Sequence, residues 1–564
     1  MMSKVWLKWW PQGVPFSINY PIIPLYDFLR NSARKYPNRT ALIFYGNKIS
    51  YISLGEAASK FANALKHLGV KKGDRVALML PNIPQFIISY YGALMAGGTI
   101  VALNPLSEEA EIGRELADSD AETVIVLDRF LQKAEAARSL AQVKNIVATK
   151  GEAYLPRRLK RLSTFRREKP SARGFPRLEA LVKEYPPLSE EAAIDPLEDL
   201  AVIQYTGGTT GTPKGVMLTH YNLVANALQT YHWLRGWGHS HKPQLSGCPV
   251  VLAAVPFFHI YGMTVAMNEV IQSGSTMVLL PQPEAGAMLK AIEQYRVTHL
   301  PAIPSMYRAV LEHPDLKKRN LSSLAYCVSG GGPIDAEVVE EFTEATGARF
   351  FEGYGLTEAG PVTHCTSLEM GTTKRESVGI PFPDTEARIV DIHTGEEELP
   401  VGEEGELVLR GPQVMKGYLG MPEETARALR NGWLYTGDVA TMDEDGFFYI
   451  VDRKQDRITA HGHTIWPTRV EEVLLQHPAV KEAVVVGVAD PMRCATDLRV
   501  LVVLKDGSRG AVNPEDLMPF CREKLEAYQV PEIIDIVENL PRTALGKVSR
   551  RAVRERLEKP GRPL

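Results

Sequence analysis

A chain of 564 residues is too long for one hydrophobic core, because cores stop growing at about 250–300 residues, so several compact units are expected. The hydrophobic content of 45% and the charged content of 23% are those of a globular protein, and the net charge of −3 gives no reason to expect nucleic-acid binding. The five cysteines lack CxxC spacing, which argues against a disulfide framework or a zinc site and favours a reducing cytosol. No apolar run reaches the roughly 18 residues of a transmembrane helix, and the first residues have no signal-peptide core, so we expect a cytoplasmic protein.

Helical and strand-like segments alternate along the first part of the chain. Residues 51–69 carry apolar side chains at helical spacing, and residues 75–80 form a strand-like apolar run. Further short apolar runs occur at 100–103 and 123–127. This alternation predicts a parallel α/β unit.

The same alternation resumes after residue 200 and ends near residue 386. From about residue 386 to residue 450, short alternating strands with Gly-Glu turns predict a small β-rich subdomain. The remainder of the chain predicts a compact α+β unit. We therefore expect a multidomain α/β protein, with an N-terminal domain at 1–452 and a C-terminal domain at 453–564.

A basic segment at 155–178 interrupts the α/β pattern. It is rich in arginine and lysine, with a few apolar residues between them. A surface insertion with a solvated basic face is one interpretation. The alternative is a peripheral contact with anionic lipid at the inner membrane surface, which the basic and weakly amphipathic composition suits.

The strongest chemical signal lies between residues 205 and 216. Its glycines allow several backbone N–H groups to converge on one anion, while its threonines and Lys214 add donors and positive charge. Lys214 stands between Pro213 and Gly215, so the spacing differs from a Walker A loop. A Gly/Thr-rich surface turn is the plain alternative, but the composition favours a polyphosphate-binding loop. The residues predicted to contact phosphate are Thr206, Gly207, Gly208, Thr209, Thr210, Gly211 and Lys214.

Three further motifs suit nucleotide chemistry. The segment Glu352–Glu358 offers an aromatic face, a hydroxyl and a carboxylate, and Mg²⁺ prefers such hard oxygen ligands. In Tyr435–Asp438, an ionised aspartate can accept two hydroxyl donors at once. The segment Pro541–Lys547 ends in a cation that can bring an anionic carboxylate to an anionic α-phosphate.

These motifs, in this order, resemble those of the acyl-adenylate-forming, or AMP-binding, superfamily. Together with Gly73–Arg75 and Asn104–Pro105, they make the chain look closest to bacterial-type long-chain fatty acyl-CoA synthetases. The resemblance covers nearly the whole chain. It implies a large N-terminal domain of two α/β lobes plus the β-rich subdomain, with a small mobile α+β C-terminal domain.

The resemblance also implies the nucleotide site. Besides the phosphate loop, it assigns ATP and AMP binding to Gly331, Gly332, Tyr354, Gly355, Thr357, Asp438 and Arg453. In this assignment the adenine lies between the Gly331–Gly332 wall and the stacked Tyr354 ring. Thr357 bonds a phosphate oxygen, Asp438 accepts the ribose hydroxyls, and Arg453 reaches the ribose or a phosphate.

The remaining roles implied by the resemblance concern catalysis, the hinge and CoA. Lys547 drives adenylation, Glu358 helps to hold Mg²⁺, and His259 approaches the substrate carboxylate or moves when the C-terminal domain turns. A satisfied core histidine is the alternative for His259, because a histidine beside aromatic residues is commonly structural. Gln455 stands at the hinge, where relatives have Asp or Lys, and Gly462 borders the CoA tunnel. The paired histidines beside Gly462 lack further ligands, which argues against a metal there.

The implied reaction has two steps at one site. ATP with Mg²⁺ and a carboxylic acid, expected to be a long-chain fatty acid, give acyl-AMP and pyrophosphate, after which the CoA thiol attacks the mixed anhydride. Several alternatives stay open. The acid can instead be medium-chain or aromatic, the acceptor can be a carrier-protein thiol, or the scaffold can serve as a non-catalytic acyl or nucleotide sensor. The oligomeric state is also open, including a homo-oligomer.

Overall fold

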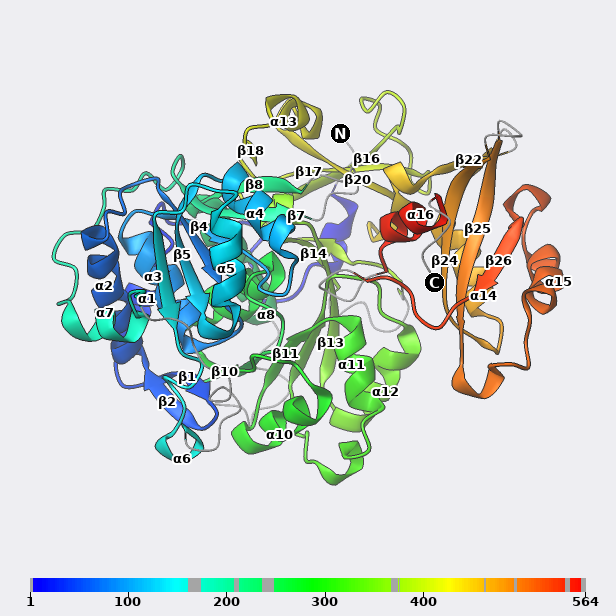
Figure 1. Ribbon diagram of the computed structural model, residues 1–564. Coiled ribbons are helices and arrows are strands. Elements are labelled where there is room, and N and C mark those ends of the chain that lie inside the picture. Colours follow the sequence, from blue (N-terminus) through cyan, green and yellow to red (C-terminus); the bar gives the residue numbers. More distant parts are fainter. Residues whose placement is uncertain are drawn as a thin grey trace.

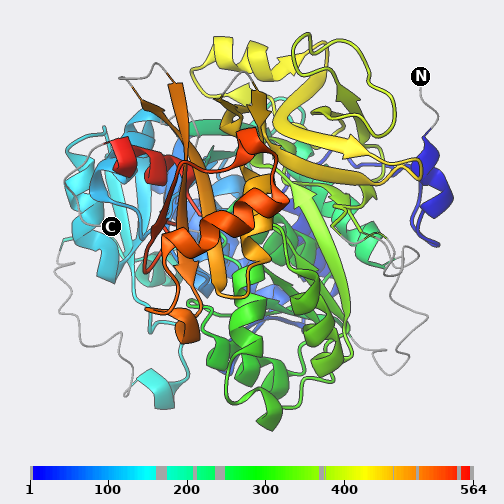
Figure 2. The same ribbon diagram turned by 90° about the vertical axis from the view of Figure 1, so that its right-hand side faces the viewer.

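A computed structural model of the chain describes residues 4–160, 174–206, 213–235, 248–366, 374, 376–460, 463–490, 495–542 and 548–558. Two α/β lobes lie side by side, a β-rich sheet lies across one end of them, and a small unit follows at the carboxyl end of the chain (Figure 1). In the view of Figure 2, the small unit lies in front of the lobes.

The first lobe is built on a seven-stranded sheet. Its strands, in spatial order, are β18 (Gly417–Tyr418), β8 (Lys214–Thr219), β7 (Leu200–Thr206), β4 (Thr99–Ala102), β3 (Arg75–Met79), β5 (Ala121–Leu127) and β6 (Asn145–Thr149). Strands β7, β4, β3, β5 and β6 are parallel to one another, whereas β8 is antiparallel to β7. The helices up to residue 235 are α1 (Asp27–Lys35), α2 (Tyr51–His67), α3 (Pro84–Met95), α4 (Glu109–Asp118), α5 (Leu131–Arg138), α6 (Arg157–Lys160), α7 (Leu178–Glu184) and α8 (His220–Arg235).

The second lobe is built on a nine-stranded sheet. Its strands, in spatial order, are β15 (Ile380–Pro381), β14 (Val362–Cys365), β13 (Arg349–Gly355), β12 (Tyr326–Ser329), β11 (His299–Ala302), β9 (Val250–Ala253), β10 (Thr276–Leu279), β1 (Thr40–Phe44) and β2 (Asn47–Ser50). Its helices are α9 (Glu269–Gln272), α10 (Ala285–Tyr295), α11 (Pro304–Leu311) and α12 (Ala336–Thr346). The central strands are parallel, and both lobes have strands that are buried along their whole length, such as β4 and β10. Helices on both faces cause this burial.

The β-rich sheet comes from residues 386–453. Its strands are β16 (Glu386–Val390), β17 (Gly405–Arg410), β20 (Trp433–Met442), β19 (Leu429–Arg430) and β21 (Phe448–Arg453), which pairs with β20. All the pairings are antiparallel. Helix α13 (Pro422–Ala428) precedes β19. The predicted β-rich region therefore forms a sheet of its own.

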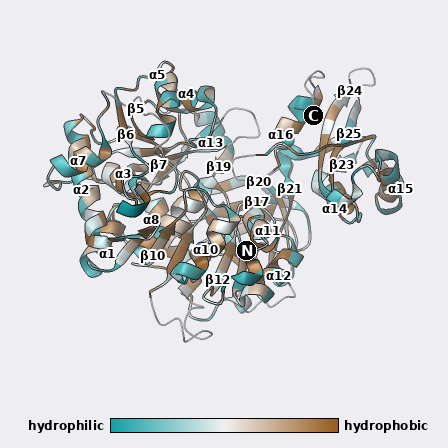
Figure 3. Ribbon diagram, turned by 60° about the horizontal axis from the view of Figure 1, so that its bottom comes forward, coloured by the Kyte–Doolittle hydropathy of each residue, from teal (hydrophilic) through white to brown (hydrophobic). Residues whose placement is uncertain are grey.

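The small carboxyl-terminal unit has helices on both faces of a short sheet. Its elements are β22 (Ile458–Ala460), β23 (His463–Ile465), α14 (Pro467–Leu475), β24 (Val480–Asp490), β25 (Ala495–Leu504), α15 (Pro514–Lys524), β26 (Ile533–Ile536) and α16 (Arg550–Glu558). Alternate residues of a strand face opposite sides. Accordingly, Val485 and Val500 share a core with α14 and α15, whereas Val484 and Leu501 share another with Val553 of α16. Figure 3 shows these strands as hydrophobic ribbon between more polar helices.

The first described residues lie against the β-rich sheet. A 3-10 helix at Val5–Trp9 places Trp6 edge-on to Phe448, with ring centroids 6.0 Å apart, and Trp9 beside Phe447 at 5.6 Å. Lys8 pairs with Asp445 at 2.5 Å. Figure 2 shows this segment (blue) beside the sheet (yellow). The start of the chain is thus tied to a segment more than four hundred positions away along the chain.

The predicted fold class is confirmed. The helix expected at 51–69 is α2, and the strands expected at 75–80, 100–103 and 123–127 are β3, β4 and β5. The charged segment between β4 and β5 forms helix α4. Of the basic segment at 155–178, residues 161–173 lie outside the described residues, so its contact with lipid stays a prediction.

Candidate functional site

The motifs predicted to bind adenine meet at the ends of two neighbouring strands. Strands β12 and β13 are parallel, and Ser329 pairs with Glu352 in their register. The turn after β12 carries Gly331 and Gly332, while the end of β13 carries Tyr354. Because parallel neighbours end at the same edge of a sheet, the glycine turn and the tyrosine lie next to each other.

Gly355 has a steric reason to be glycine. A Cβ at this position would lie 2.1 Å from the carbonyl oxygen of Pro361, and a real Cβ never approaches backbone so closely. The chain turns back at this point, since β13 pairs antiparallel with β14. The turn carries a short 3-10 helix, Thr357–Ala359, which contains the predicted phosphate and Mg²⁺ ligands Thr357 and Glu358.

Asp438 lies at the centre of a polar cluster. Its side chain is 3% exposed, and its Oδ1 lies 2.7 Å from Nε of Arg453, which is directly opposite on the paired strand. Its Oδ2 accepts a hydrogen bond of 2.5 Å from the Tyr354 hydroxyl. An ionised carboxylate has about four lone-pair positions, so two stay available for further donors. The structure therefore brings together the residues predicted to bind adenine and ribose.

Lys214 and Glu358 are connected through Tyr418. The Tyr418 hydroxyl donates to Oε1 of Glu358 at 2.8 Å, and the Lys214 ammonium lies 5.0 Å from the centre of the Tyr418 ring. Burial, and then the carboxylate of Glu358, raise the pKa of Tyr418 above its ordinary value, which keeps the hydroxyl protonated as a donor. Lys214 also pairs with Glu424 at 2.6 Å, and this hydrogen bond lowers the pKa of Glu424.

Sequence reasoning missed Tyr418 and Glu424. They belong to β18 and α13, about two hundred positions after Lys214 along the chain, and no motif that we recognised includes them. Their contact with Lys214 arises because β18 pairs with β8 at the edge of the first sheet. Only the tertiary fold shows it.

The ends of the predicted phosphate loop lie side by side. Thr206 pairs with Lys214 in the antiparallel ladder of β7 and β8. The loop residues Gly207, Gly208, Thr209, Thr210 and Gly211 lie outside the described residues, as do Gly462 and Lys547. Their roles stay predictions.

His259 lies near the glycine turn that follows β12. It is half-buried, and its Nδ1 accepts a hydrogen bond of 3.2 Å from the backbone N–H of Tyr261. The Tyr261 ring in turn covers Gly330, where a Cβ would lie 3.3 Å from the ring. A π-helix, Gly262–Asn268, follows at once, and such helices occur frequently at functional sites.

The predicted hinge residue Gln455 lies in a 3-10 helix, Lys454–Asp456, directly after β21. Lys454 pairs at 2.7 Å with Glu406 of β17, whose side chain is 5% exposed. One residue earlier, Arg453 reaches Asp438. The connection to the carboxyl-terminal unit thus begins within the polar cluster.

The described residues suit a metal ion that is bound partly by the nucleotide and partly by the protein. Among them, no three His, Cys, Asp or Glu side chains are grouped so as to hold a metal ion by themselves. Mg²⁺ commonly binds through one or two carboxylates plus substrate phosphates, and Glu358 near Lys214 supplies a carboxylate of that kind. The residues present therefore fit Mg²⁺ that arrives with a nucleotide.

The comparisons with known proteins agree with this geometry. Residues 29–419 match the family model described as AMP-binding enzyme, and residues 469–547 match the AMP-binding enzyme C-terminal domain. A long-chain-fatty-acid–CoA ligase of Bacillus subtilis (strain 168) is 42% identical over 560 residues, which are 98% of this chain and 98% of the relative. A feruloyl-CoA synthase of an Amycolatopsis species is 34% identical over 524 residues, 93% of this chain and 97% of the relative. The crystal structure of ATP-bound MatB from Rhodopseudomonas palustris superposes with a TM-score of 0.81 at 27% identity, covering 95% of this chain and 99% of that one.

These matches confirm the predicted superfamily and, with it, the predicted class of enzyme, an acid–thiol ligase that uses ATP. Within the described ranges, no helix has both the length and the apolar character to cross a bilayer. The chain belongs to the AMP-binding enzyme family.

Proposed function

We propose that this enzyme activates a long-chain fatty acid with ATP and transfers the acyl group to CoA. The observation that carries the proposal is the cluster of Tyr354, Asp438 and Arg453, in which a nearly buried carboxylate keeps two lone-pair positions for ribose hydroxyls. The long-chain acid is supported by the ligase of Bacillus subtilis, which matches along nearly the whole chain.

In this proposal each motif has one task. The adenine lies between Tyr354 and the Gly331–Gly332 turn. Thr357 and the phosphate loop up to Lys214 bind phosphate oxygens, because these groups donate hydrogen bonds or carry positive charge. Glu358 holds Mg²⁺, which would supply charge neutralisation of the phosphates.

The first half-reaction forms the acyl-AMP. A carboxylate oxygen attacks the α-phosphorus of ATP, the bond to the β-phosphate bridging oxygen breaks, and pyrophosphate leaves. Lys547 brings the two anions together and stabilises the charge of the transition state. Thr206, Lys214 and the loop between them hold the leaving pyrophosphate. His259 lies beside the incoming carboxylate.

The second half-reaction forms the thioester. The CoA thiol gives its proton to solvent, its sulfur attacks the acyl carbon, and AMP leaves with the bonding electron pair. The C-terminal domain, residues 453–564, turns about Gln455 relative to residues 1–452, which withdraws Lys547 and brings Gly462 to the CoA chain. A cytoplasmic location, a contact of residues 155–178 with membrane lipid, and the oligomeric state remain predictions.

An aromatic acid is the second candidate substrate, because the relative from Amycolatopsis is a feruloyl-CoA synthase. Exchange of labelled pyrophosphate into ATP, measured with a panel of long-chain, medium-chain and aromatic acids, separates the two. We expect the fastest exchange with long-chain acids. Faster exchange with aromatic acids contradicts the proposed substrate, and exchange with none contradicts acid activation altogether. Release of AMP that depends on CoA then separates CoA from a carrier-protein acceptor.

A further inference from the structure

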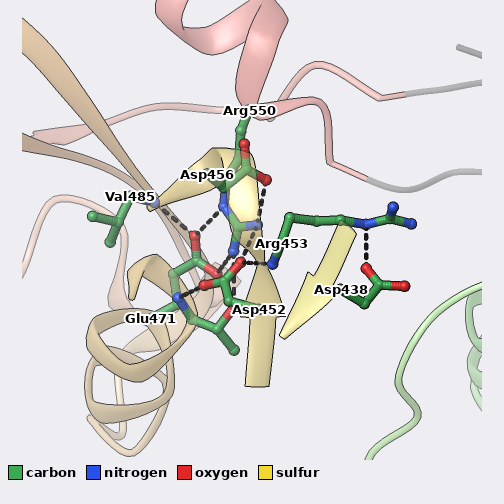
Figure 4. A network of polar contacts seen from close by, with 8 residues as sticks. Asp438, Asp452, Arg453, Asp456, Glu471, Val485 and Arg550 are labelled. Carbon is green, nitrogen blue, oxygen red and sulfur yellow. Dashed lines mark hydrogen bonds and ion pairs between the residues drawn. The ribbon is translucent and has the colours of Figure 1, made fainter. Parts of the chain in front are cut away.

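Arg550, the first residue of α16, is surrounded by carboxylates (Figure 4). Its Nη2 donates to Oε2 of Glu471 at 2.6 Å and its Nε donates to Oε1 at 3.1 Å. Its Nη1 lies 3.4 Å from Oδ1 of Asp452 and 3.3 Å from Oδ2 of Asp456. Nη2 also donates to the hydroxyl of Thr468 at 3.1 Å. One guanidinium therefore connects three acidic side chains.

The cluster is largely shielded from water. The side chain of Asp452 is 1% exposed, that of Glu471 is 13% exposed, and that of Arg550 is 19% exposed. Charges interact more strongly where water is excluded, and the removal of one partner leaves the other unpaired. The planar guanidinium also matches Glu471 through two parallel bonds, which a lysine cannot make.

The contacts of Arg550 fall on both sides of the predicted hinge. Asp452 belongs to β21, where it pairs with Val439 in the β-rich sheet. Asp456 and Glu471 follow Gln455 in the chain. If the chain turns about Gln455 as proposed, Arg550 stays with Asp456 and Glu471 but is separated from Asp452. The bond of 2.9 Å from the Thr468 N–H to Oδ2 of Asp452 breaks as well.

The same strand carries the nucleotide cluster. Arg453 follows Asp452 directly, and successive strand side chains point to opposite sides. Figure 4 shows Arg453 directed to Asp438 while Asp452 is directed to Arg550. The contact that crosses the hinge is thus one residue away from the predicted ribose site.

We propose that Arg550 is a positioning residue that fastens the carboxyl-terminal unit to β21 through Asp452, and thereby sets the balance between the two half-reactions. The proposal rests on the proposed function. A domain that must take two orientations needs contacts that are specific to one of them, and the Arg550–Asp452 pair is such a contact. Its loss lowers the population of the orientation seen here and raises that of the other.

The test compares Arg550→Gln and Asp452→Asn with the unchanged enzyme. The asparagine of the second variant keeps an oxygen that can accept from the Thr468 N–H, but it loses the ion pair with Arg550 and one acceptor, since Oδ1 of Asp452 also accepts from the Arg453 N–H at 2.7 Å. The ATP affinity of this variant is therefore measured as well, because Arg453 reaches the predicted ribose site. Arg551→Gln is the matched control, because Arg551 lies next in the same helix and pairs with Glu555, one turn further along α16. Arg550→Lys keeps the charge without the bidentate geometry, and we expect its effect to be intermediate.

Two readouts are needed. The first readout is the rate of pyrophosphate exchange divided by the rate of thioester formation from supplied acyl-AMP. We expect this ratio to change by about fivefold or more, and in the same direction, in both variants. The second is the distance distribution between spin labels at two exposed positions, Leu106 and Asp506, which we expect to shift in both variants. Neither readout should change in Arg551→Gln.

An unchanged distance distribution, or an equal loss of both half-reactions, would overturn the proposal. If Arg550→Gln fails to fold, Asp452→Asn and Arg550→Lys decide together, because the lysine variant leaves both backbone hydrogen bonds to Asp452 in place. If the unchanged enzyme performs neither half-reaction, the proposed function fails, and the distance measurement still tests whether Arg550 holds the orientation.

Discussion

Asp438 is the residue on which the predicted nucleotide site depends most. It holds both the Tyr354 hydroxyl and the Arg453 guanidinium, and it is nearly buried. A buried carboxylate that is already paired does not need to be reorganised when ribose hydroxyls arrive. This preorganisation suits the cluster to the proposed binding of ribose hydroxyls.

We expect Asp438→Asn to weaken ATP binding by about tenfold or more, since it removes the ion pair with Arg453 and replaces one acceptor by a donor. Isothermal titration of ATP measures the effect. Asp443→Asn is the control, because Asp443 lies in the turn between β20 and β21 and pairs with Lys374 instead. Equal ATP affinity of the Asp438 variant and the control would refute the ribose role.

The protonation of His220 makes the free energy of unfolding depend on pH. Burial lowers the pKa of His220 from 6.5 to about 4, and its Nδ1 accepts a hydrogen bond of 3.0 Å from the Leu25 N–H. Between about pH 4 and pH 6.5, His220 is protonated in the unfolded chain but not in the folded chain. Stability therefore falls as pH decreases from 6.5 to about 4, by about 1.4 kcal/mol per pH unit at most.

We expect His220→Asn to remove this part of the pH dependence, because the asparagine oxygen lies where Nδ1 lies and can accept the bond from the Leu25 N–H, but asparagine does not titrate. Urea denaturation of both proteins between pH 7.5 and about pH 4 measures the difference. Parallel stability curves for the two proteins would mean that His220 is not the group responsible.

At this scale the sequence indicated which residues gather in the candidate site, but not all of the side chains that contact them. Tyr354, Asp438 and Arg453 stand in recognisable motifs, and the structure brings them together. Tyr418 and Glu424 had no such signal, since an isolated tyrosine or glutamate is common anywhere on a surface. Side-chain contacts between distant segments depend on tertiary packing, which local patterns do not encode.

At the scale of elements, the helices and strands of the lobes were largely predictable, because strongly periodic or continuous apolar segments leave few alternatives. Helix α2 and strands β3, β4 and β5 are examples. The π-helix at Gly262–Asn268 was not predicted. A Cβ at Gly262 would lie 2.2 Å from the carbonyl oxygen of Pro256, so the chain can enter this helix only through a glycine, but the glycine alone does not indicate the helix type.

The first 3-10 helix, Val5–Trp9, packs against the β-rich sheet, a contact that the sequence did not predict. Trp6 is 7% exposed and lies against Phe448 of the β-rich sheet. We expect Trp6→Ala to lower the free energy of unfolding by about 3–5 kcal/mol, since it removes a large buried side chain and leaves a cavity. Urea denaturation followed by circular dichroism measures the loss.

Phe16→Ala is the control for this element, because Phe16 is 63% exposed and belongs to the same N-terminal segment. We expect it to change stability by less than about 1 kcal/mol. A similar effect of both substitutions would contradict the anchoring role of Trp6.

At the scale of the whole molecule, the described residues of the candidate site come from both lobes and from the β-rich sheet. The first sheet supplies Thr206 and Lys214, the second supplies Tyr354, and the β-rich sheet supplies Asp438. Glu358 comes from the 3-10 helix between β13 and β14. The overall fold class was predictable because the order of apolar and charged segments differs between the units. The contacts of the carboxyl-terminal unit with the rest of the chain were not, since they join side chains that are far apart in the sequence, such as Arg550 and Asp452.

In the proposed mechanism, this division between units separates the two half-reactions. If Lys547 serves only the first, its loss must affect the two steps unequally. We expect Lys547→Ala to slow acyl-AMP formation by at least about 100-fold, because it removes the cation that stabilises the attack of one anion on another. Lys505→Ala, an exposed lysine of the same unit, is the control and should leave both steps unchanged.

The most direct test measures both half-reactions in the Lys547→Ala enzyme. Pyrophosphate exchange into ATP reports the first step, and thioester formation from supplied acyl-AMP and CoA reports the second. The predicted result is a loss of exchange with thioester formation retained within about tenfold. Equal loss of both steps, or exchange at the unchanged rate, would contradict the assignment of Lys547 and with it the two-step account of this site.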